Sequence, residues 1–133
     1  MRLLIRIALI ALAPLLPSGC RSGKSYDGPT VDAFTGRLVA DGKPVSFPPG
    51  EKVQLGVTHH ASAREWWIPI QTDGTFKIGW MPIGKYTAML KRPSNAPARQ
   101  GGGRPSLYTV PTTFEIVDGK TDYTIDLGKE YKP

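Results

Sequence analysis

The sequence TDGTFKIGWMPIGKYTAMLK (Thr72–Lys91) contains two runs of alternating apolar and polar residues, separated by a corner rich in glycine and proline. Alternation with a period of two is typical of a half-buried strand, and it predicts strands over Thr75–Ile78 and Tyr86–Lys91. Pro82 and Gly84 interrupt any ladder between the two runs and bend the backbone. We therefore expect the corner to lead into a neighbouring strand, with both strands contributing to one core.

The same strand pattern recurs before and after this stretch. Trp66 shares its parity with the apolar residues that follow it, so it should face the core, whereas Trp67 should face outward. Three of the Asp-Gly pairs, at residues 41–42, 73–74 and 118–119, indicate tight turns, and Asp118-Gly119, flanked by two strands, is the strongest hairpin signal in the chain. About seven short strands, with no apolar recurrence at helical spacing, predict an all-β fold: a small antiparallel β-sandwich. The other expected strands span residues 31–40, 53–58, 65–71, 112–117 and 121–127.

Two motifs resemble a known family. Asp73–Phe76 followed by Pro82–Tyr86 resembles the D-G-x-F…P-x-G-x-Y signature of carboxypeptidase regulatory-like domains, which are related to Cna-B and transthyretin-like β-sandwiches. Gly36–Val45 is similar to the first hairpin of that family, and the likeness covers about residues 31–127. The resemblance implies an accessory or adhesive module without catalytic residues. Cna-B-like domains often carry a Lys–Asn crosslink, but the sole asparagine here, Asn95, lies in a proline-rich segment, so no such crosslink is expected.

The first 19 residues have the composition of a secretory leader, in which a short basic segment precedes an apolar stretch, Ile7–Leu16. This stretch is too short to span a bilayer as a helix. Leu16–Cys20 is similar to a bacterial lipobox, although Pro17 stands where leucine is usual. Cys20 is the single cysteine, so it pairs with another chain, stays a free thiol or is modified. Its position at the end of the leader favours lipidation, which predicts export and anchoring to a bacterial cell membrane.

The chain of 133 residues is thus expected to have four parts. Residues 1–19 form a lipoprotein signal peptide, residues 20–30 the lipidated cysteine and a flexible tether, residues 31–128 the sandwich, and residues 129–133 a C-terminal tail. The formal net charge is +6, but the basic residues are spread along the chain without a run or a helix to carry them. This distribution argues against nucleic-acid binding.

No catalytic or cofactor motif is present in the sequence. His59 and His60 are adjacent, so on a strand they project to opposite faces and cannot chelate one metal ion together. No G-x-S-x-G elbow, H-E-x-x-H pair or glycine-rich phosphate loop occurs. The sequence therefore predicts a non-catalytic protein with no metal and no cofactor.

Binding residues are sought among outward aromatic and basic side chains. The segment 92–111, RPSNAPARQGGGRPSLYTVP, is either a mobile insertion or a basic binding loop that carries Arg99 and Arg104 beside Tyr108. Trp67 and Trp80 are candidates for stacking on a sugar ring or a peptide, although Trp80 is equally suited to closing one end of the core. The predicted role is a structural or protein-interaction module at the envelope; the alternative is a carbohydrate- or peptide-binding module that uses these residues.

Overall fold

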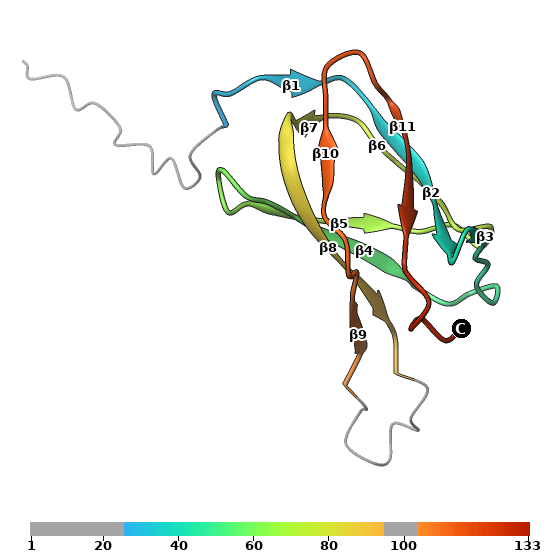
Figure 1. Cartoon of the computed structure of the whole chain (residues 1–133). Helices are drawn as coiled ribbons and strands as arrows, with labels where there is room; N and C mark the ends of the chain where they lie inside the picture. Colours follow the sequence, from blue (N-terminus) through green and yellow to red (C-terminus); the bar gives the residue numbers. More distant parts are fainter. Residues whose placement is uncertain (1–25, 95–103) are drawn as a thin grey trace, which may run out of the picture.

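The computed structural model describes residues 26–94 and 104–133, and every regular element in this part of the chain is a β-strand (Figure 1). Among these residues no helix is long and apolar enough to cross a membrane. The strands are β1 (Thr30–Val31), β2 (Phe34–Ala40), β3 (Lys43–Pro44), β4 (Gln54–His59), β5 (Glu65–Pro69), β6 (Thr75–Ile78), β7 (Met81–Pro82), β8 (Gly84–Arg92), β9 (Ser106–Thr109), β10 (Phe114–Ile116) and β11 (Asp122–Asp126).

The strands form two main sheets around one core. One sheet has the order β10-β8-β4-β5, with β9 also paired to β8, and the other has the order β11-β2-β3, with β6 also paired to β2. Strand β8 shows how the core is filled: Tyr86, Ala88 and Leu90 are buried, and the residues between them are more exposed. Because side chains of both sheets belong to a single buried cluster, the predicted all-β sandwich is confirmed.

The corner in Thr72–Lys91 connects the two sheets. Strand β6 pairs with β2, whereas β8 pairs with β4, so the corner leads from one sheet into the other and the two strands are not paired with each other. Met81 and Pro82 of the corner pair with β1, and the fully buried Met81 side chain fills the space between the layers. The prediction of a shared core is confirmed, because Phe76 and Tyr86 are both buried.

The residues of the family-like signature hold this corner in place. The Asp73 carboxylate accepts hydrogen bonds from the Thr75 hydroxyl at 2.6 Å and the Thr75 backbone N–H at 3.1 Å, and these bonds lower the pKa of Asp73. The Tyr86 hydroxyl donates to the Pro82 carbonyl at 2.7 Å, which closes the corner from the inside. Gly84 has a φ of 142°, a region that glycine alone adopts readily. The signature therefore has a structural role in this chain.

The predicted hairpin around Asp118-Gly119 is not formed. The turn exists, with Gly119 at a φ of 77°, but β10 pairs with β8 in one sheet and β11 pairs in parallel with β2 in the other. The Tyr123 hydroxyl accepts from the Val117 N–H at 3.1 Å and donates to the Lys120 carbonyl at 3.1 Å, so a side chain replaces the missing ladder. The two strands contribute to the core from opposite sheets, Ile116 from β10 and Tyr123 and Ile125 from β11.

The segment 92–111 is also more regular than predicted. Strand β8 continues through Arg92, and β9 pairs with it, so part of the expected loop is a β-hairpin. This hairpin extends from the end of the domain opposite the point where the described chain begins (Figure 1). Composition did not reveal β9 because Ser106–Thr109 has only one clear inward side chain, Tyr108, between turn-forming residues.

Both ends of the described chain pack against the sandwich. Tyr26, within the expected tether, places its ring edge-on to His59 at 5.6 Å between centroids. Thr30, also within that tether, already belongs to β1. Tyr131, within the expected tail, is 8% exposed and is part of the core cluster. The packed domain therefore extends beyond the predicted limits of residues 31 and 128.

Candidate functional site

The end of the sandwich where the chain arrives is built around His59. Its side chain is 1% exposed, with Nδ1 2.7 Å from the Ser62 hydroxyl and Nε2 3.1 Å from the Ile83 carbonyl oxygen. Because a carbonyl oxygen only accepts, Nε2 donates to Ile83, while Nδ1 and the Ser62 hydroxyl share the second hydrogen bond. The ring also contacts Tyr86 at 5.0 Å and Tyr26 at 5.6 Å. His59 therefore joins the chain arriving at Tyr26 to the core.

This use of both nitrogens leaves His59 no lone pair for a metal ion. His60, the other half of the pair, is exposed and is not on the same face. Over residues 26–94 and 104–133, no group of three or more His, Cys, Asp or Glu side chains is placed to hold a metal.

Two tryptophans meet at the same end. Trp80 lies between β6 and β7 and is 47% exposed, and its ring stands edge-on to Trp66 of β5 at 6.3 Å. Trp66 is partly buried and contacts Tyr86 in the core, also at 6.3 Å. A shallow hollow of about 190 Å³ lies here, lined by Arg64, Glu65 and both indoles. Trp80 thus combines the two roles considered for it: it covers the end of the core and also presents a broad apolar surface to solvent.

Trp67, by contrast, is not a free platform. It faces outward as predicted, but its ring lies flat over Gly56 of β4, where a Cβ would come within 2.6 Å of the indole. The Lys91 ammonium sits 4.3 Å from the ring centroid and covers its outer side. Because the Lys91 ammonium already lies over the ring, a sugar that stacks on Trp67 would have to compete with this cation–π contact.

Tyr108 is likewise a structural residue. Its hydroxyl donates to the Leu127 carbonyl at 2.5 Å, and its ring packs edge-on against Tyr131 at 5.2 Å. These contacts tie β9 to the C-terminal segment. The prediction of Tyr108 as a ligand-stacking residue is therefore not supported by its placement.

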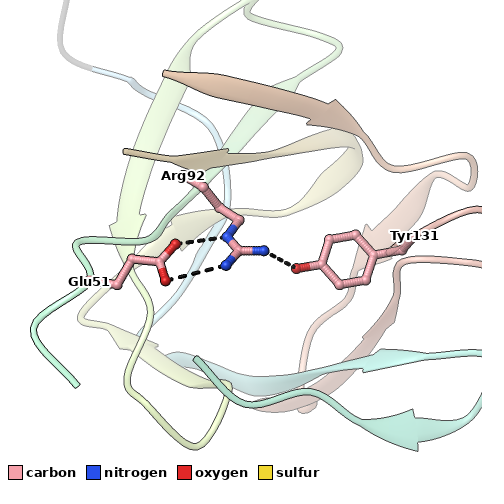
Figure 2. Close-up of polar contacts among 3 residues, drawn as sticks. All are labelled: Glu51, Arg92 and Tyr131. Atoms are coloured by element: carbon pink, nitrogen blue, oxygen red, sulfur yellow. Dashed lines mark hydrogen bonds and ion pairs between the residues drawn. The ribbon is translucent and has the colours of Figure 1, made fainter. Parts of the chain in front are cut away.

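An ion pair between Arg92 and Glu51 lies next to Tyr131 (Figure 2). Arg92 Nε donates to one Glu51 carboxylate oxygen at 2.8 Å and Nη2 to the other at 3.3 Å, while Nη1 is 3.5 Å from the Tyr131 hydroxyl oxygen. The side chains of Arg92 and Glu51 are 24% and 10% exposed. The bond to Glu51 raises the pKa of Arg92, and burial raises the pKa of Tyr131. Arg92, at the start of the segment interpreted as a basic loop, is thus a structural cation.

The far end of the β8–β9 hairpin keeps some exposed groups. Arg104 is exposed and lines a polar hollow of about 390 Å³ together with Glu51 and Arg92. Leu107, on the outer face of β9, is 59% exposed. Arg99, the third predicted binding residue of this segment, lies outside the described residues, as do Cys20 and Asn95.

The chain is similar in fold to two solved DUF3823 family proteins. The protein from Bacteroides ovatus is 23% identical, with a TM-score of 0.43 over 71% of this chain. The protein from Parabacteroides merdae is 21% identical, with a TM-score of 0.44 over 77% of this chain. The matches span 42% and 46% of those two proteins, so this chain corresponds to less than half of their length. No protein-family model and no curated protein matches the chain.

Of the predicted binding residues, Trp80 and Arg104 are exposed, whereas Trp67 and Tyr108 make contacts within the fold. Sequence reasoning missed the contact between Trp66 and Trp80, because those residues belong to separate strands whose pairing is not evident from local pattern. One signal for Trp67 was present: Gly56 occupies an outward-facing position of its strand, between Leu55 and Val57, and a glycine within a strand often marks a close approach by another group.

Proposed function

We propose that this chain is an exported protein anchored to a bacterial membrane by a lipid on Cys20, and that its sandwich is a non-catalytic interaction module. One observation carries the proposal. Tyr26 packs on the sandwich at the end opposite the β8–β9 hairpin, and only five residues (21–25) separate it from Cys20. An anchor at Cys20 would therefore present that hairpin away from the membrane, toward partners.

The role of the buried polar side chains supports a non-catalytic module. His59 uses both ring nitrogens within the fold, and Arg92 and Glu51 bind each other. Among the described residues, every buried side-chain nitrogen and oxygen has a hydrogen-bond partner. The polar atoms of these side chains are engaged with one another or with the backbone, so they stabilise the sandwich.

We also propose that the sandwich is of the carboxypeptidase regulatory-like class. Support comes from the structural roles of the resembled signature, in which Asp73 orders the turn and Tyr86 closes the corner onto Pro82. The resemblance to that class implies an accessory or adhesive module.

The alternative function is binding of an envelope carbohydrate or a peptide at the β8–β9 end. The observation that favours it is the pairing of exposed Arg104 with a polar hollow, close to exposed Leu107 on β9. A charged group beside an apolar side chain is a common arrangement at binding surfaces.

The decisive test is the intact mass of the native protein from the membrane fraction, measured beside a Cys20→Ser variant. A mass that begins at Cys20 with added acyl chains, together with an unprocessed or released variant, is the expected result. A native chain without acyl groups would refute the anchor.

For the alternative, binding to peptidoglycan and to envelope polysaccharide is compared between the native protein and Arg104→Glu, with Lys132→Glu as a control of equal charge change. Equal binding by both variants would refute a site at Arg104.

A further inference from the structure

We propose that the end of the sandwich where Tyr26 docks rests on the bilayer surface, with the Trp80 indole inserted among the lipid headgroups. This inference rests on the proposed lipid anchor at Cys20. It assigns an orientation to the domain and a binding role to a tryptophan whose exposure is otherwise unexplained.

The first argument is the reach of the chain. A flexible tether of residues 20–30 would let the domain stand clear of the membrane, but Tyr26 already contacts His59 and Thr30 is already in β1. Six Cα-to-Cα steps separate Cys20 from Tyr26, and fully extended they span at most about 22 Å. An anchored Cys20 would thus keep Tyr26 within about 22 Å of the headgroups, a distance smaller than the length of most small domains.

The second argument is the position of Trp80 relative to that docking point. Its neighbour Met81 pairs with Val31 of β1, directly after the tether. The backbone N–H of Ile83 donates to the Pro29 carbonyl at 2.9 Å, which adds a second link between the arriving chain and this corner. The arriving chain and Trp80 are therefore fixed together at one end of a rigid body, so the membrane that holds one is close to the other.

The third argument is the chemistry of the exposed side chain. Tryptophan is enriched at membrane–water interfaces, because its large apolar ring and single N–H suit the headgroup region. Trp80 is 47% exposed, although the Trp66 ring braces it from one side. Val117, in the turn after β10, is 39% exposed, and the register of Ile116 opposite Gly84 locates that turn at the same end. Two apolar side chains on one end fit a lipid surface.

The charges around Trp80 indicate which lipid headgroups this end of the sandwich would bind. Arg64 and Glu65 line the hollow beside the indole, and Lys85 lies opposite Glu115 across β8 and β10. These four side chains carry two positive and two negative charges, so together they do not form the basic patch that binds anionic lipid or nucleic acid. We expect docking to depend on the indole and to occur on zwitterionic phosphatidylcholine, with little dependence on salt.

The test uses the full mature lipoprotein reconstituted in phosphatidylcholine vesicles that contain a lipid with a nitroxide on its headgroup. The nitroxide quenches tryptophan fluorescence at short range, and quenching is compared for the native protein, Trp80→Phe and the matched control Trp67→Phe. We expect Trp80→Phe to lose most of the quenching and Trp67→Phe to keep it, because Trp67 lies on the outer face of β5 beneath Lys91. Adding 1 M salt should leave the quenching unchanged.

The outcomes separate this inference from the function on which it rests. A lipidated, vesicle-bound protein whose quenching is the same in Trp80→Phe would overturn the docking surface and leave the anchor intact. A native chain without acyl groups would overturn both. Protection of Trp80 from acrylamide by soluble envelope polysaccharide, without quenching in vesicles, would assign the surface to a glycan and refute the membrane. Equal urea midpoints for the two tryptophan variants establish that neither result comes from misfolding.

Discussion

Removing the carboxylate of Glu51 should destabilise the sandwich more than a surface ion pair would. Exposed pairs contribute about 0–1 kcal/mol, whereas breaking a buried pair costs about 3–5 kcal/mol. The pair with Arg92 lies between these limits, since the two side chains are 10% and 24% exposed and two hydrogen bonds join them. For Glu51→Ala we expect a loss of about 2 kcal/mol in the free energy of unfolding, equivalent to a decrease of about 10 °C in Tm for a domain of this size.

The assay is urea unfolding followed by tryptophan fluorescence for a double-mutant cycle of Glu51→Ala and Arg92→Ala. Glu115→Ala, at an exposed position opposite Lys85, is the matched control and should cost less than about 1 kcal/mol. The loss from Glu51→Ala should persist in 1 M salt, because a largely buried pair is poorly screened. A coupling energy below about 0.5 kcal/mol between the two sites would refute the reasoning, since it would mean that each side chain acts independently.

Three further outcomes are expected from single substitutions. Gly56→Ala should lift the Trp67 ring, because the new Cβ would lie 2.6 Å from it, and acrylamide should then quench Trp67 more strongly. Tyr86→Phe should cost about 1–3 kcal/mol, since a buried backbone carbonyl loses its donor. Burial raises the pKa of Tyr86 in the folded state, so the unfolded chain ionises first and native stability should fall as the pH rises above about 10. The Tyr86→Phe variant should show a shallower fall, and equal slopes in alkaline urea titrations would contradict this. Tyr108→Phe should cost about 1 kcal/mol by freeing the Leu127 carbonyl, and an unchanged urea midpoint would count against that bond.

Local pattern predicted the strands well but not the partners of those strands. The alternation in β8 and the positive φ of Asp41 and Gly42 are local properties, and both were evident from the sequence. The separation of β10 from β11 was not evident, because it depends on the Tyr123 hydroxyl and on edges that exist only once the two sheets have formed. Asp-Gly specifies a turn, and it does not specify that the flanking strands pair with each other.

The candidate binding residues show the same contrast between local features, which the sequence reveals, and long-range contacts, which it does not. Trp80 could be predicted because it sits in a corner, where no strand parity buries it. The burial of Trp67 under Lys91 could not, because that contact joins β5 to β8 across β4. Tyr108 was misjudged because its partner, the Leu127 carbonyl, is 19 residues away on another segment. In each failure the deciding contact is long-range.

The parallel pairing of β11 with β2 governs when this chain can fold. Thr35 donates to the carbonyl of Thr121, 86 residues later, so the sheet that contains β2 is incomplete until almost the whole domain is available. Long-range pairing of this kind slows folding, because a large loop must close before its contacts form. A nascent chain with this topology stays open while it is synthesised from its N-terminus. In the exported protein proposed above, such a delay would keep the polypeptide unfolded until it has crossed the membrane, and the last strand to arrive would close the fold on the far side.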